Sequence, residues 1–156
     1  MAVPSRPYVE QVPDLDDFAA LSHEVDGLVV VSTVRADTTV QSSVVNAGVL
    51  PSPFDRRPTL AFVSYGRVKL ANLRTRPQIA VTTRSGWRWS TVEGRAELVG
   101  PDDPREGVDS EALRLLLRAV FLAAGGSHDN WAEYDRTMVE QRRAAVLVTP
   151  TRVYGS

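Results

Sequence analysis

The 156-residue sequence contains no cysteine and only two histidines. The absence of cysteine excludes disulfide bonds, cysteine-bound zinc and a thiol nucleophile. Neither His23 nor His128 has an aspartate or glutamate at a spacing typical of metal ligands, and no G-x-S-x-G motif is present. We therefore expect neither a metal site nor a hydrolytic triad.

Long apolar runs and a strong net charge are also missing. The run GLVVV is far shorter than the roughly 20 residues of a membrane span. The formal net charge of −1 gives no overall field towards nucleic acid or an anionic membrane. The first 18 residues contain three prolines and no apolar segment typical of a signal peptide. We expect a cytoplasmic protein with no nucleic-acid or membrane partner.

The pattern of apolar residues predicts one domain at 14–156, preceded by an extended, proline-containing arm at 1–13. β-Branched and apolar runs predict strands at 27–34, 40–50, 59–64, 78–83, 87–100 and 144–149. Helical spacing predicts helices at 14–24, 67–75, 110–124 and 129–143. Because the strands follow one another mostly as hairpins, and no G-x-G-x-x-G motif follows a strand, we predict a mainly-β protein with helical insertions, built as a six-stranded antiparallel barrel.

The strand at 87–100 changes its apolar face partway along. Trp87 and Trp89 share one face, whereas Val92, Ala96 and Leu98 share the other. Since successive side chains point to opposite faces of a strand, this change predicts a β-bulge or aromatic residues outside the core. The two tryptophans are typical of a core or a subunit interface, and the alternative is contact with a ligand.

The segment GRVKLANLRTRP (66–77) carries four cations on a short predicted helix. Arg67 and Lys69 fall in its first turn, beside free N–H groups that already make the backbone electropositive. Together with a glycine and the hydroxyl of Ser64, these two cations predict a phosphate site at a strand-to-helix turn. The alternative is a solvated basic patch, because such a placement costs at most about 1 kcal/mol when it is exposed.

The strand at 40–50 is polar for a strand beside a core. Gln41, Ser42, Ser43 and Asn46 offer donors and acceptors that can bind the ring or the ribityl chain of a ligand. The alternative is a half-exposed edge strand. The residues alone thus favour a small β-barrel that binds a phosphate-bearing ligand, in which a cofactor supplies the chemistry.

The helix at 110–124 is apolar on nearly all sides. Seven of its residues are Leu, Val or Phe. A helix of this kind has to be covered on several sides, which in a chain of this size suggests a partner subunit.

Three blocks in order resemble a known family: VQSSVVNAGVL (40–50), GRVKLANLRTRPQIAVTT (66–83) and GWRWSTVEGRAELVGPDDP (86–104). They resemble the split β-barrel proteins of the pyridoxamine 5′-phosphate oxidase-like superfamily. Within it, they are most similar to the actinobacterial coenzyme F420-dependent reductases of the flavin/deazaflavin oxidoreductase family. The tail at 128–155 is similar to the same branch, so the resemblance covers about residues 14–155.

The resemblance implies a homodimer with two cofactors bound between its subunits. It implies that Arg67 and Lys69 hold the cofactor phosphate, with Asn72 as a possible helper. It also implies that residues 41–44 (Gln41, Ser42, Ser43 and Val44) line the deazaflavin ring or its linker, and that Trp87 lies near the cofactor or the facing subunit. Exposed cations would contact an oligoglutamate tail, the candidates being Arg57, Arg142 and Arg143.

The activity implied is hydride transfer from the reduced deazaflavin to an electron-poor small-molecule acceptor. No residue is assigned as the general acid, and Tyr65 is a candidate because it adjoins the phosphate turn. Two alternatives stay open. One is an FMN protein of the same fold, and the other is a non-catalytic carrier of F420 or of another planar ligand such as haem, for which His23 is the candidate ligand.

Overall fold

The computed structural model describes residues 13–156, so the predicted N-terminal arm lies outside the described residues except for Pro13. The helices are α1 (Asp16–Glu24), α2 (Arg67–Thr75), α3 (Ser110–Ala123) and α4 (Trp131–Glu140). The strands are β1 (Leu28–Val34), β2 (Val40–Pro51), β3 (Pro58–Ser64), β4 (Gln78–Ser85), β5 (Arg88–Val99) and β6 (Ala144–Gly155).

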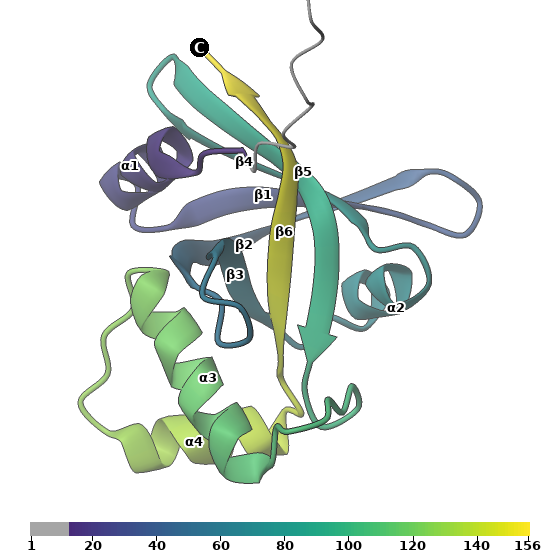
Figure 1. Ribbon diagram of the computed structural model, residues 1–156, viewed down its shortest axis with the longest axis vertical. Helices are drawn as coiled ribbons and strands as arrows, with labels where there is room; N and C mark the ends of the chain where they lie inside the picture. The colour runs from purple at the N-terminus through teal and green to yellow at the C-terminus, as the bar shows by residue number, and fades with distance from the viewer. Residues whose placement is uncertain (1–12) are drawn as a thin grey trace, which may run out of the picture.

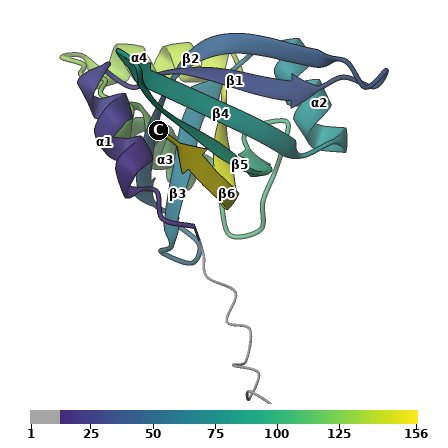
Figure 2. The ribbon, with the colours of Figure 1, turned by 90° about the horizontal axis from the view of Figure 1, so that it is seen from above.

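The strands form a closed barrel in the order β1-β2-β3-β6-β5-β4, and every neighbouring pair is antiparallel. The predicted fold class is confirmed. Figures 1 and 2 show α1 and α2 on opposite sides of the barrel, with α3 and α4 together against a third side.

One strand changes its partner partway along. Residues 40–46 of β2 pair with β1, and residues 47–51 pair with β3. The ladder between β2 and β3 ends where Ala47 lies opposite Phe62. Beyond that point the chain leaves β3 and turns into α2. The barrel wall is therefore split between the first half of β2 and the start of α2.

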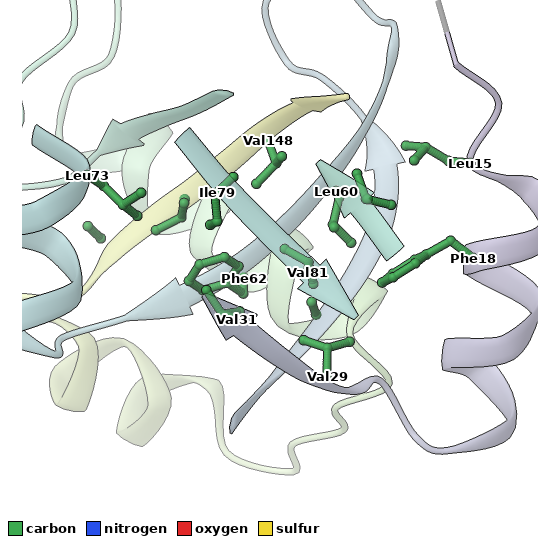
Figure 3. Close-up of a cluster of buried hydrophobic side chains, with 14 of the residues drawn as sticks. Leu15, Phe18, Val29, Val31, Leu60, Phe62, Leu73, Ile79, Val81 and Val148 are labelled. Carbon is green, nitrogen blue, oxygen red and sulfur yellow. The ribbon is translucent and has the colours of Figure 1, made fainter. Parts of the chain in front are cut away.

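The barrel interior is filled by alternating side chains of the strands and closed by two helices. Phe18 and Leu15 come from the region of α1, Leu73 comes from α2, and all three are buried. Figure 3 shows Leu73 at one side of this cluster and Phe18 at the other, with Phe62 and Val81 between them. Burial of these large apolar side chains contributes about 1.5–3 kcal/mol each.

A second cluster covers the outer face of β3 and β6. Leu117 and Val120 of α3, with Met138 of α4, pack on Ala61 and Leu147. Strand β3 and the first five residues of β6 are thus buried on both faces, which explains their nearly continuous apolar sequences. The chain itself covers much of the apolar helix at 110–124, although Leu115 and Leu122 remain about half exposed.

The predicted C-terminal end of the last strand was wrong. We predicted a strand at 144–149, but β6 continues through Pro150 to Gly155. A register shift between Glu93 and Gly94 lets β6 accommodate the proline, because Gly94 pairs with Pro150 while Glu93 pairs with Arg152. The extra residue of this shift, Thr151, lies on β6, so the bulge is in the partner strand and not in the fifth strand. Trp87 and Trp89 lie outside the core, as the other alternative for the fifth strand predicted.

Among residues 13–156, no helix is both long and apolar enough to cross a membrane.

Candidate functional site

A pocket of about 730 Å³ opens at the split between β2 and α2. One wall is β2, another is the turn from β3 into α2, and the third is the C-terminal end of α3. The pocket is lined by Asp26, Val44, Val45, Asn46, Val63, Ser64, Tyr65, Gly66, Lys69, Val120, Phe121, Ala124, Gly125, Gly126 and Arg143.

Lys69 is the most unusual side chain of this pocket. Only 6% of its surface is exposed, and its ammonium lies 5.7 Å from the ring centre of Phe62. Burial alone lowers the pKa of this ammonium, since no carboxylate or hydrogen-bond acceptor within residues 13–156 offsets the loss of water. The ammonium lines the open pocket and has no anionic partner in the described chain, so it is available to pair with an anion there.

The start of α2 adds backbone donors to the same corner. Gly66 precedes the helix without a capping side chain, and the first turn contains no acidic residue. Helices α3 and α4, in contrast, are capped by the side chains of Asp109 and Asn130. The free N–H groups of α2 and its dipole therefore remain available for an anion.

The geometry around Gly66 brings these groups together. A Cβ placed on Gly66 would lie 3.7 Å from Ser64 Oγ and 3.9 Å from Lys69 Nζ. The Ser64 hydroxyl also accepts a hydrogen bond from the Gly66 N–H, at 3.3 Å. Ser64, Lys69 and the start of α2 thus converge on a small volume, which we call the phosphate corner.

A second cation lines the pocket next to this corner. The guanidinium of Arg143 stacks on the ring of Tyr65, 4.2 Å from the ring centre. Its Nε donates to Gln141 Oε1 at 2.7 Å, and no carboxylate within residues 13–156 is paired with it. The preceding residue, Arg142, is paired with Asp102 instead. The pocket therefore holds two cations that lack a carboxylate partner.

The β2 wall offers backbone hydrogen-bonding groups to a ligand. The N–H of Ala47 donates to Gly27 O at 2.8 Å, on the β1 side of the strand. Because successive residues of a strand point their backbone groups to alternate edges, those of Asn46 and Val44 face the split. The Asn46 side chain donates to Asp26 O at 2.9 Å, which fixes its orientation at the pocket wall.

A shallower depression of about 1020 Å³ adjoins this pocket, because Val44 lines both. It lies on the outer face of β1 and β4, where Leu28, Val30 and Trp89 are partly exposed. Trp87, at the turn between β4 and β5, is 97% exposed and lines the same depression. Trp87 and Trp89 thus mark one end of an exposed apolar face.

The structure brings together six of the predicted candidate residues in the pocket: Val44, Asn46, Ser64, Tyr65, Lys69 and Arg143. Trp87 lines the adjoining depression. Arg67 is exposed at the first residue of α2 and does not line the pocket.

The other predicted site residues lie outside the pocket lining. Asn72 is buried and donates to Thr33 Oγ1 at 3.0 Å, and this hydroxyl donates to Gln41 Oε1 at 3.2 Å. Ser42 pairs with the Ser32 hydroxyl on the outer face of the sheet, and the buried hydroxyl of Ser43 has no partner in the described chain. Asn72 and Gln41 thus belong to a polar cluster inside the barrel.

The three cations proposed for an acidic tail are also separated. Arg143 lines the pocket, Arg142 is bound to Asp102, and Arg57 is exposed in the loop between β2 and β3. Tyr65 lines the pocket beside the phosphate corner. His23 is exposed near the end of α1 and does not line the pocket.

Sequence reasoning missed the third wall of the pocket. Phe121, Gly125 and Gly126 come from the end of α3, far away in the sequence. Gly48 and Gly27 are the residues that let the end of α3 approach the barrel. A Cβ at Gly48 would lie 2.1 Å from Ala123 O, and a Cβ at Gly27 would lie 2.3 Å from Ala124 O. Such contacts cannot be inferred from spacing along the chain.

The described residues 13–156 contain no group of three or more His, Asp or Glu that could hold a metal ion. The fold and the pocket together define a split-barrel protein whose pocket carries two cations without a carboxylate partner in the described chain. The sequence profile of the Pyridoxamine 5′-phosphate oxidase family matches residues 16–156, and the chain belongs to this family.

Solved structures share the fold at low sequence identity. The conserved hypothetical protein Rv2991 from Mycobacterium tuberculosis is 17% identical, with a TM-score of 0.64 over 97% of this chain and 89% of that one. A protein described as an F420 reductase is 20% identical, with a TM-score of 0.58 over 92% of this chain and 98% of that one. A heme binding protein from Mycobacterium smegmatis is 15% identical, with a TM-score of 0.57 over 92% of this chain and 54% of that one.

Proposed function

We propose that the protein is a reductase that uses reduced coenzyme F420 to deliver a hydride to an electron-poor small molecule, such as an enone, a quinone or a tetrapyrrole. The observation that carries this proposal is the unpaired ammonium of the largely buried Lys69 side chain, which lines the pocket beside the uncapped start of α2. Such a corner stabilises an anion and is costly when empty. Family membership and the resemblance of three sequence blocks to F420-dependent reductases support the choice of cofactor.

The residues of the pocket fit this cofactor. Lys69, Ser64 and the N–H groups of α2 would hold the phosphate, and the backbone of Val44 and Asn46 would bind polar groups of the ring or its linker. Arg143 would contact a carboxylate of the acidic tail. When bound, the reduced deazaflavin supplies the hydride.

The protein contributes orientation and charge rather than a nucleophile. The phosphate corner fixes one end of the cofactor, and the apolar side chains of Val44, Val120 and Phe121 exclude water from part of the pocket. Tyr65 carries the phenol hydroxyl of this pocket, and solvent is the other source of the proton that accompanies the hydride. Replacement of Tyr65 by Phe distinguishes these sources through the pH dependence of kcat.

The same proposal includes a homodimer with the cofactor between its subunits. The outer face of β1 and β2 exposes Leu28, Val30 and Val44, and Trp87 extends this apolar face. Contiguous apolar surface of this kind favours association. Because Val44 belongs both to this face and to the pocket, a second copy packed here would also border the cofactor.

Two other functions use the same pocket. An FMN protein of this fold would bind its phosphate at the same corner, and the family that gives the match is named for an oxidase. A non-catalytic carrier is favoured by the similarity of fold to a heme binding protein. The exposed position of His23 outside the pocket lining disfavours its role as a haem ligand at this site.

The first experiment is a fluorescence titration of the purified protein with coenzyme F420 and with FMN. We expect tighter binding of F420, and preferential binding of FMN would overturn the choice of cofactor. Gly66→Ala is the most specific variant, because its added Cβ would enter the phosphate corner without a close contact in the free protein. We expect this variant to fold as the wild type does and to bind the cofactor less tightly. Arg136→Met, which removes an exposed cation on α4, is the matched control and is expected to bind as the wild type does.

The second experiment measures turnover. Consumption of reduced coenzyme F420 is followed with a panel of enones, quinones and tetrapyrroles. Acceptor-dependent consumption that is lost in Gly66→Ala supports a reductase. Tight binding without consumption for any acceptor would favour the carrier.

A further inference from the structure

A tight turn outside the pocket forms ion pairs with the two segments that carry the pocket cations Lys69 and Arg143. The turn is formed by residues 100–103, after β5. Its backbone is closed by two hydrogen bonds between Gly100 and Asp103, each 3.1 Å long. Gly100 packs so closely on β6 that a Cβ there would lie 2.8 Å from the Cβ of Ala144. The turn is therefore a fixed point on the barrel, and neither of its aspartates lines the pocket.

Asp103 holds the far end of α2. Its two carboxylate oxygens accept hydrogen bonds from Nε and Nη2 of Arg74, both at 2.8 Å. The Asp103 side chain is only 13% exposed. Arg74 lies in the last turn of α2, and Lys69 lies in the first turn of the same nine-residue helix. Because a helix this short moves as a rigid body, a shift at Arg74 is transmitted to Lys69.

Asp102 binds Arg142, which is the residue before the second pocket cation, Arg143. Its carboxylate accepts two hydrogen bonds from Arg142, which has the left-handed backbone conformation with φ of 49°. Non-glycine residues adopt this conformation rarely, so the contact helps to maintain the turn before β6. The next residue is Arg143, which lines the pocket.

An ordinary surface role is the competing interpretation. Arg74, Arg142 and Asp102 are all substantially exposed, and exposed ion pairs contribute little to stability. Two features distinguish this pair of contacts. Both are bidentate, and they come from adjacent residues of one backbone-closed turn towards the two segments that carry Lys69 and Arg143. A displacement of about 1 Å at a charged site is sufficient to weaken binding strongly.

We propose that the turn at 100–103 sets the separation of Lys69 and Arg143, with Asp103 as a positioning residue for the phosphate-bearing ligand. This inference depends on the proposed function, because it concerns the same pocket. Asp103 acts through Arg74 and α2 and does not contact the ligand.

The sign of one substitution tests this proposal. Asp103→Asn removes a negative charge near a site for anions, so a purely Coulombic effect would strengthen the binding of coenzyme F420 or FMN. Loss of positioning would instead weaken it. We expect the dissociation constant to rise about three- to ten-fold, while the circular dichroism spectrum and Tm stay close to those of the wild type.

A double-mutant cycle with Arg74→Gln completes the test. If the two residues act as one contact, Arg74→Gln, Asp103→Asn and the double variant all weaken binding by a similar factor. Coulombic effects alone predict opposite signs for the single variants and cancellation in the double variant. That pattern, or wild-type affinity in Asp103→Asn, would overturn the proposal. Arg74→Gln keeps the test valid should Asp103→Asn fail to fold.

Lys69→Met separates this proposal from the proposed function. If the wild type binds neither cofactor, both ideas fail. If the wild type binds and Lys69→Met does not, but Asp103→Asn binds normally, only the positioning role fails.

Discussion

Replacement of Lys69 by Met is expected to stabilise the ligand-free protein while it abolishes cofactor binding. The substitution keeps an unbranched side chain in the space between α2 and Phe62, and it removes the ammonium. The substitution loses a weak cation–π contact at 5.7 Å, and it regains the cost of partly desolvating a charge that has no carboxylate partner. We expect a net gain of about 1–2 kcal/mol, or about 2–8 °C in Tm for a chain of this size.

The pH dependence follows from the direction of the pKa shift. Burial lowers the pKa of Lys69 below the value of 10.5 for an unperturbed lysine. Between these two pKa values the unfolded chain binds more protons than the folded one, so the stability of the wild type rises with pH in that window. The advantage of Lys69→Met is therefore complete below the folded pKa and disappears as the pH approaches 10.5.

Chemical denaturation monitored by circular dichroism, at neutral and alkaline pH, measures this difference. Arg67→Met is the matched control, since it removes a cation from the same helix terminus that is already exposed. We expect little change in its stability. The reasoning is refuted if Lys69→Met is less stable than the wild type at neutral pH, or if Arg67→Met gains as much, because burial would then not be the cause.

Three further substitutions test other parts of the structure. Gly48→Ala would place a Cβ 2.1 Å from Ala123 O and force α3 away from β2, which should cost about 1–3 kcal/mol in a denaturant titration. Thr33→Val would leave the buried amide of Asn72 without its acceptor, with an expected loss of about 1–3 kcal/mol in the same assay. Leu28→Arg places a charge on the exposed apolar face and should halve the mass seen by analytical ultracentrifugation without lowering Tm. Unchanged stability in either of the first two, or an unchanged mass in the third, would contradict the contact concerned.

Much of the fold follows from the sequence because its signals are local. Alternating β-branched residues, helical spacing and turn residues are read within a dozen positions, and the resulting antiparallel barrel is confirmed. The change of apolar face in the fifth strand also has a local signature, because Trp87 and Trp89 lie outside the core at its start. The predicted end of the last strand was wrong because Pro150 is accommodated in β6 opposite Gly94 of β5, a contact that the local sequence does not indicate.

Residues of the candidate site could be predicted together only where they lie in one segment of the chain. Lys69 and Ser64 lie in the same strand-to-helix turn, so their common position follows from spacing. The difference between Arg67 and Lys69 depends on which face of α2 meets the barrel, and that is decided by tertiary packing. Arg143 reaches the pocket from the other end of the chain, and nothing in its neighbouring residues indicates this.

The exchange of partners by β2 has a consequence for how selectivity can change. Its first seven residues are held by β1 and its last five by β3. The edge of the strand that borders the pocket is therefore not required to close the cylinder of strands. Val44 and Asn46 are exposed along this edge, whereas Val45 between them packs against the core. Changes at Val44 and Asn46 can therefore alter the pocket wall at little cost in folding, so this open seam is where related chains can diverge in what they bind.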